Sequence, residues 1–208
     1  MDSTILFALV AVLLAFLAMR AVQLWPTYEG SIFEELFSSY LEYFWRMRFL
    51  HDLSVSSYLG RCIGNHKIVY NSVLGKNEAH LAEFVTVFSE HGFLSICSVP
   101  LKGDVISSKG KGTWKVETPE GIRKIKSPAA MIDQQRAFLE SALGTDVQVS
   151  YLIAFGNGST FKHVSSSSSI PVMTYQEAGV HLMQMREGGI GPEDVQAAFE
   201  AFRKAAEQ

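Results

Sequence analysis

A long uncharged apolar run near the start of the chain constrains its fold and location more than any other feature. Between Thr4 and Met19 there is no charged side chain, and the apolar stretch continues past Arg20 to Trp25. A helix of roughly 20 apolar residues crosses a bilayer, and an arginine near its end can extend its charged head to the headgroups. The run predicts a transmembrane anchor over residues 1–28, with Arg20, Trp25 and Tyr28 at the membrane interface.

A cleaved signal peptide is the rival interpretation of this run. Such a peptide begins with a positively charged segment, whereas residues 1–4 include Asp2 and no basic side chain. We therefore expect an uncleaved, single-pass anchor in the lipid bilayer. Because Asp2 precedes the run and Arg20, Arg46 and Arg48 follow it, the positive-inside rule predicts an outside N-terminus and a cytoplasmic C-terminal domain.

The rest of the composition indicates one ordinary globular core. The chain has 208 residues, of which 48% are hydrophobic, and its formal net charge is -3. That charge gives no global attraction to a polyanion, so a dedicated nucleic-acid-binding protein is not indicated. Cys62 and Cys97 lie among apolar neighbours without the spacing of a metal site, so we expect two buried free thiols and no disulfide partner.

The segment that follows the anchor, residues 29–56, has a helical pattern. Ser31 and Glu34 have the spacing of a capping box, and apolar side chains recur at helical spacing from Phe33 to Phe44. We expect one amphipathic helix over residues 31–50. It either lies in the membrane surface, with Arg46 and Arg48 near lipid headgroups, or packs on the domain, because the apolar stripe alone does not say what covers it.

Helical and extended patterns alternate over residues 57–208, which predicts a layered α/β domain. A weakly patterned link, residues 54–72, leads into it. The expected helices cover residues 76–89, 128–143, 175–185 and 192–206. The expected strands cover residues 93–99, 147–155 and 170–174, with two or three more in a meander over 105–126.

Four short motifs occur in an order and spacing that agree with one known family. They are Gly75-Lys76-Asn77-Glu78, the run KGDVISSKGKGTW from Lys102, Ser127-Pro128 with Gln134-Gln135, and YLIAF from Tyr151. Together they resemble the NERD (nuclease-related) domain over roughly residues 73–185. The resemblance implies a restriction-endonuclease-like fold, here with a reduced central sheet flanked by helices. In that fold an Asp, a Glu-x-Lys strand and a helix Glu hold a divalent metal against a phosphate.

This chain departs from the family pattern at the metal position. With His91-Gly92-Phe93 placed on the family's strand, Cys97 stands where the metal Glu belongs and Val99 where the Lys belongs. The Asp-bearing strand is expected to be missing, because the predicted helix to Ser89 leads almost directly into the next strand. Sulfur matches Mg²⁺ poorly, so we expect no metal and no cofactor unless a rearranged site holds Mg²⁺.

Two relic candidates remain, and each has a structural alternative. Glu78 could be a leftover metal ligand, but the helix dipole favours a glutamate in a first turn in any case. Gln135 is the residue from which the family's Gln faces the site, and a satisfied core amide is the alternative. His181 is expected to be a core histidine. Lys102 and Asp104 are the residues that a rearranged site would use with Glu78.

Basic residues gather in one stretch. It holds seven basic against three acidic side chains, a net charge of +4. Its basic residues are Lys102, Lys109, Lys111, Lys115, Arg123, Lys124 and Lys126. The stretch could bind nucleic acid or anionic lipid through its phosphates, or it could be the solvated face of a hairpin.

Three functional hypotheses follow. The first is a membrane-anchored, catalytically inactive NERD-like module that serves as a binding or scaffold subunit of a membrane-associated assembly, with protein partners and with DNA as one conceivable cargo. The second is an active metal-dependent nuclease with a rearranged site. The third is an unrelated α/β subunit of a membrane complex.

Overall fold

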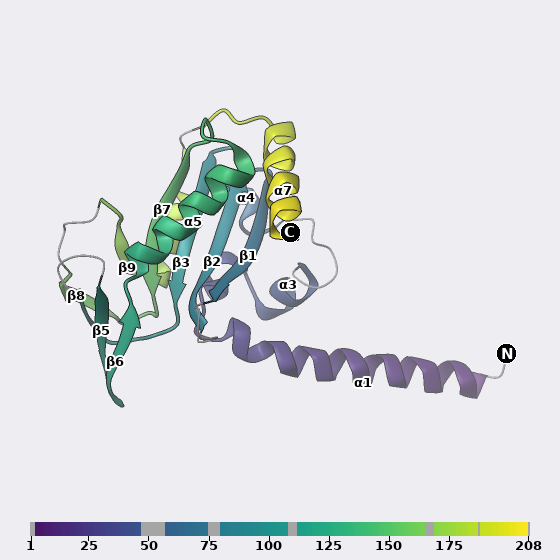
Figure 1. The fold of residues 1–208 in the computed structure, drawn as a ribbon. Coiled ribbons are helices and arrows are strands. Elements are labelled where there is room, and N and C mark those ends of the chain that lie inside the picture. The colour runs from purple at the N-terminus through teal and green to yellow at the C-terminus, as the bar shows by residue number, and fades with distance from the viewer. Residues whose placement is uncertain are drawn as a thin grey trace.

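The structure is a computed structural model that describes residues 3–46, 57–74, 80–107, 112–164, 169–186 and 188–207. Within these residues the chain is a mixed α/β protein with two sheets and a long N-terminal apolar helix (Figure 1). The helices are α1 (Ser3–Tyr28), α2 (Phe33–Leu36), α3 (Tyr40–Trp45), α4 (Gly60–Ile63), α5 (Pro128–Leu143), α6 (Tyr175–Met183) and α7 (Pro192–Ala206). The strands are β1 (His66–Leu74), β2 (His80–Ser89), β3 (Gly92–Val99), β4 (Asp104–Ile106), β5 (Thr113–Thr118), β6 (Gly121–Lys126), β7 (Val149–Phe155), β8 (Thr160–His163) and β9 (Val172–Thr174).

The larger sheet has the strand order β1-β2-β3-β7-β9. Strands β1, β2 and β3 pair antiparallel with one another. Strands β3, β7 and β9 run parallel to one another. Residues 93–99 of β3 are all buried, as expected for a central strand that is covered on both faces. A parallel step needs a long crossover, and the crossover from β3 to β7 contains β4, β5, β6 and α5.

The smaller sheet has the order β6-β5-β4-β8, and it confirms the meander predicted over residues 105–126. Its inner face carries Val105, Trp114 and Val116, which join one apolar cluster with the ends of β3 and β7. The outer face of β5 is exposed. The smaller sheet therefore closes one end of the larger one.

Helices cover both faces of the larger sheet. On one face, α2, α4 and α6 contribute Leu36, Ile63 and Leu182 to a buried cluster with Val85 and Ile96 of the sheet. The other face is covered by α5 and α7, which lie in front of the strands in Figure 1. Full burial of side chains of this size contributes about 1.5–3 kcal/mol each, so these two layers hold the domain together.

The helix predicted over residues 76–89 is wrong for the part that the structure describes. Residues 80–89 form β2, which pairs with both β1 and β3. Leu81, Phe84, Val85 and Phe88 have helical spacing, but residues 84–88 also form a continuous run with β-branched and aromatic side chains. Such a run fits a strand that is buried on both faces, which periodicity alone does not separate from a buried helix. The link over residues 54–72 likewise contains α4 and most of β1.

The single helix predicted over residues 31–50 is also wrong. Two short helices, α2 and α3, are separated by Phe37, whose backbone is extended at φ -123° and ψ 141°, and Ser39 caps α3 by accepting from the Glu42 N–H. Phe33, Phe37 and Tyr43 pack into the domain core. The domain-packing alternative therefore holds for the inner side of this segment.

Other predictions are confirmed. The helices at residues 128–143 and 192–206 and the strand at 93–99 have the expected positions, and the elements near 147–155, 170–174 and 175–185 are present with shorter bounds. Both cysteines are free thiols. Cys97 is buried, and Cys62 is partly buried.

Candidate functional site

The position that the NERD resemblance assigns to the metal lies in the middle of the larger sheet. In the register of β2 and β3, Cys97 stands directly opposite Phe84, and both side chains are fully buried. The strand that precedes β3 is thus present, which corrects the expectation that it is missing. A ligand shared with position 97 would come from the facing position on β2, and that position holds a phenyl ring.

The surroundings of Cys97 are apolar. Val99, Trp114, Met131 and Phe155 belong to the same buried cluster, and the rings of Trp114 and Phe155 are stacked with centroids 6.3 Å apart. Burial raises the pKa of the Cys97 thiol well above its usual range. The thiol is therefore neutral near pH 7, and it is neither an activated nucleophile nor a thiolate ligand.

Gln135 lies on the sheet-facing side of α5 and is 1% exposed. Asn71 of β1 donates to the Gln135 Oε1 atom at 3.0 Å, and the Gln135 amide donates back to Asn71 Oδ1 at 3.4 Å. Asn71 stands opposite Phe84 in the sheet. The structure thus brings Gln135 to the sheet face beside the Phe84–Cys97 pair, where its amide is bonded to Asn71.

Lys102 and Asp104, the described members of the other residues named for a nuclease site, are not gathered at Cys97. Glu78 lies outside the described residues. Asp104 alternates with Val105 on β4, so the valine enters the apolar cluster and the carboxylate accepts from the Thr160 hydroxyl on the opposite side. Lys102 extends over Gly158, where an added Cβ would lie 2.7 Å from the lysine Cε. Among the described residues no group of three or more His, Cys, Asp or Glu side chains could hold a metal ion.

Three of the predicted basic residues share the outer face of the β5–β6 hairpin. Lys115 stands opposite Lys124, and Lys126 is the next residue on the same face of β6. Arg123 instead forms an exposed ion pair with Glu120 at 3.2 Å. Lys109 and Lys111 lie outside the described residues. Like charges directly opposite each other cost stability, so this face is suited to an anionic partner.

A cleft of about 1100 Å³ opens at the other end of β3. The β2–β3 turn, the start of β7, the end of α6 and the start of α7 line it, with His91, Phe93, His181, Met185 and Asp194 among the lining residues. His181 is exposed there, which corrects its assignment as a core histidine. The cleft was not foreseen from the sequence, because it forms where segments far apart in the chain meet.

The end of α1 is attached to the domain by an aromatic cluster. The Trp25 and Tyr40 rings have centroids 4.9 Å apart, and those of Tyr28 and Tyr43 are 5.2 Å apart. Arg20 lies one turn before this cluster, with its guanidinium 5.4 Å from the centre of the Phe16 ring. The aromatic residues predicted for the membrane interface thus also contact α3.

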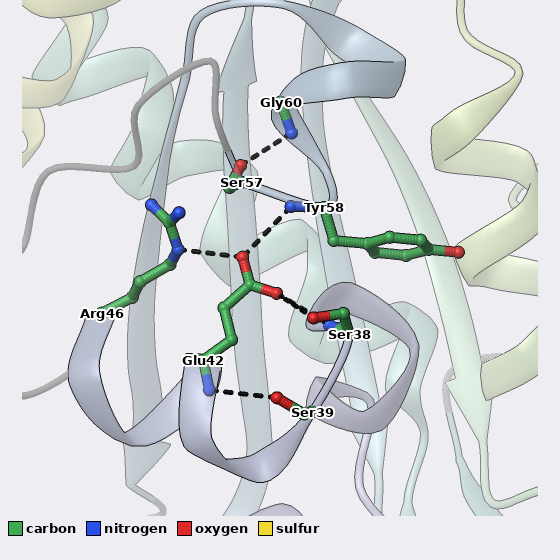
Figure 2. A network of polar contacts seen from close by, with 7 residues as sticks. All are labelled: Ser38, Ser39, Glu42, Arg46, Ser57, Tyr58 and Gly60. Atoms are coloured by element: carbon green, nitrogen blue, oxygen red, sulfur yellow. Dashed lines mark hydrogen bonds and ion pairs between the residues drawn. The ribbon is translucent and has the colours of Figure 1, made fainter.

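Glu42 connects α3 to the segment before α4 (Figure 2). Its carboxylate accepts from the Ser38 N–H and hydroxyl, from the Tyr58 N–H at 3.1 Å and from Arg46 Nε at 2.9 Å. Burial by itself would raise the pKa of this carboxyl, but the hydrogen bonds and the Arg46 charge together lower the pKa below its ordinary value. Arg46 is engaged in this network, and Arg48 lies outside the described residues.

The residues from Ile5 to Tyr28 of α1 are long and apolar enough to cross a membrane, and the side chains of residues 5–16 are exposed. This helix and the basic hairpin face are exposed, whereas the position around Cys97 is buried. Comparisons with models of protein families, with curated proteins and with solved structures find no match to this chain.

Proposed function

We propose that this chain is a membrane-anchored, catalytically inactive NERD-like module that acts as a binding or scaffold subunit of a membrane-associated assembly. The observation that carries the proposal is the filling of the expected metal position by Cys97, Phe84 and Val99 within a buried apolar cluster. Hydrolysis of a phosphodiester by a bound Mg²⁺ needs oxygen ligands in an open site that admits the phosphate.

The arrangement of the sheet is compatible with the restriction-endonuclease-like fold that the resemblance implies. Three antiparallel strands, β1 to β3, are followed, after strands β4 to β6 of the smaller sheet, by α5 and then by β7, which pairs parallel with β3. Gln135 also faces the sheet beside the Phe84–Cys97 pair, where the resemblance expects a glutamine. Both features support the fold assignment.

A cleavage assay tests the absence of nuclease chemistry. We expect the full chain, reconstituted in nanodiscs, to leave plasmid DNA and RNA intact with Mg²⁺ or Mn²⁺. Cleavage that is lost in Glu78→Ala, Asp104→Asn or Lys102→Gln would overturn the proposal and support the rearranged nuclease that uses these three residues. Glu34→Gln on α2 is the control, since it removes an exposed carboxylate elsewhere.

The orientation of the anchor is part of the proposal. Arg20 and Arg46 follow the apolar run, and the two cysteines are free thiols, which suits a reducing cytoplasm. A reporter fused after Gln208 should therefore behave as cytoplasmic. A phosphatase fusion that is active outside the cytoplasm contradicts this orientation, and a shortened mature chain supports the signal-peptide interpretation instead.

Partner capture tests the scaffold role. The full chain, solubilised from membranes with its anchor, should retain protein partners that Lys115→Gln/Lys124→Gln or an anchor replacement releases. If partners are captured but an experimental structure shows a fold unrelated to endonucleases, the chain is an unrelated α/β subunit of a membrane complex.

A further inference from the structure

The domain contacts the anchor well before the anchor ends. Tyr40 of α3 donates a hydrogen bond to the carbonyl of Ala21, and Tyr43 is hydrogen-bonded to the Thr27 hydroxyl at 3.0 Å. Ala21 precedes Tyr28 by about two helical turns, or roughly 10 Å at about 1.5 Å per residue. The first contact of α3 therefore lies far back along α1.

The part of α1 that precedes this contact is shorter than the hydrocarbon core of a bilayer is thick. The stretch of α1 from Ile5 to Arg20 rises about 24 Å, whereas the hydrocarbon core of a bilayer is about 30 Å thick. A bilayer that covers the apolar residues of α1 must therefore reach the level of Ala21 and, with it, the level of α3.

The outer side of α3 is suited to that level. Leu41 and Trp45 lie one turn apart on this side, and they are 63% and 43% exposed. The charges of the helix are turned inward, because Glu42 and Arg46 pair with each other and their side chains are only 14% and 13% exposed. The helix thus presents apolar side chains outward beside α1 without exposing an unpaired charge.

We propose that α3 is a second membrane contact, in which Leu41 and Trp45 lie at the boundary between lipid headgroups and acyl chains. The contact between α1 and α3 then fixes the depth and tilt of the domain on the bilayer. Tryptophan favours this boundary because its ring is apolar and its N–H reaches water. The inference rests on the proposed role of α1 as an anchor.

The basic hairpin supplies a matched control position. Ile122 of β6 is 61% exposed, almost the same as Leu41. In Figure 1 the β5–β6 hairpin lies at the far side of the domain from α3 and from the direction in which α1 leaves it. A probe at residue 122 therefore samples an equally exposed apolar position that the proposal leaves in water.

Fluorescence quenching in vesicles tests the proposal. Leu41→Cys and Ile122→Cys are made in the full chain with Cys62→Ser, since Cys97 is buried, and each is labelled with an environment-sensitive dye. In vesicles of neutral phosphatidylcholine, to which the basic hairpin face has no charge attraction, spin labels near the lipid headgroups should quench residue 41 several-fold more than residue 122. Aqueous iodide should show the opposite order. Blue-shifted emission from Trp45, the one tryptophan left in unlabelled chain with Trp25→Phe and Trp114→Phe, should accompany these results.

The outcomes separate this inference from the anchor itself. If residue 41 is as open to iodide as residue 122 while the chain resists alkaline extraction, α3 lies in water and this proposal is overturned, but the anchor stands. If alkaline extraction releases the chain from the vesicles, the anchor fails and the proposal fails with it.

Discussion

At the scale of single residues, position 97 decides what chemistry the sheet can support. A carboxylate there would face Phe84 and lie in a cluster with Met131 and Trp114, without a charged partner among the described residues of that cluster. Burial of an unpaired charge in such surroundings is costly. A metal-binding glutamate at position 97 and the buried apolar cluster around it therefore exclude each other, and this chain has the cluster.

Replacement of Cys97 tests this statement. We expect Cys97→Glu to lower the free energy of unfolding by more than about 3 kcal/mol at pH 7. The cluster would have to bury either a charged carboxylate or a carboxyl group that is kept protonated far above its ordinary pKa. Cys97→Ala, the control, should cost about 1 kcal/mol, the size of the lost apolar contact. Chemical denaturation of the two variants measures the difference. Equal stability of Cys97→Glu and Cys97→Ala would mean that the position is open to solvent.

Glu42 gives a prediction with a defined pH dependence. Its folded-state pKa is lowered, so its contribution to stability is present above its ordinary pKa of 4.5 and is lost as the pH falls through the folded value. Glu42→Gln should cost about 2 kcal/mol at pH 7, typical of charge-assisted hydrogen bonds in a partly buried site. The gap between the two proteins should close in acid. A gap that stays constant from pH 7 to pH 3 would exclude the carboxylate as its cause.

At the scale of elements, local signals account for what the sequence predicts well. Helix α5 has Pro128 at its start and Gly144 after its end, and α7 begins at Pro192. These residues mark helix boundaries locally, so the boundaries can be predicted from the sequence. Strand β2 differs, because its pairing with β1 and β3 is decided by residues distant in the sequence. The position of Cys97 in a buried strand is predictable from its apolar neighbours, but its pairing with Phe84 depends on the register.

The β5–β6 hairpin offers a prediction at this scale. Lys115→Gln with Lys124→Gln should weaken binding of the full chain to DNA or to an acidic protein partner, and the loss should shrink at high salt because screened charges are involved. Removal of the opposed lysines should also leave the domain as stable or slightly more stable. Arg203→Gln with Lys204→Gln on α7 makes the same change in net charge and should have little effect. An equal loss of binding in both double variants would mean that the net charge of the chain, and not the hairpin face, determines the binding.

At the scale of the whole molecule, the anchor and the basic hairpin lie on opposite sides of the domain (Figure 1). If α1 spans the membrane and α3 rests on its surface, the hairpin lies on the side of the domain away from that bilayer. This arrangement favours a partner in the aqueous phase over lipid of the same membrane. This position of the domain depends on the contacts between α1 and α3. The sequence shows these two elements only as separate apolar segments and does not reveal that they touch.

Titration with Mn²⁺ followed by electron paramagnetic resonance tests the central claim, the absence of a catalytic metal site, most directly. Free Mn²⁺ gives a strong signal that is lost when the ion enters a protein site, and a site with two or more carboxylates retains the ion far better than one with a single ligand. For the full chain in nanodiscs of neutral lipid at micromolar concentration, we predict a signal equal to that of empty nanodiscs. Stoichiometric loss of the signal that Glu78→Ala restores would contradict the account.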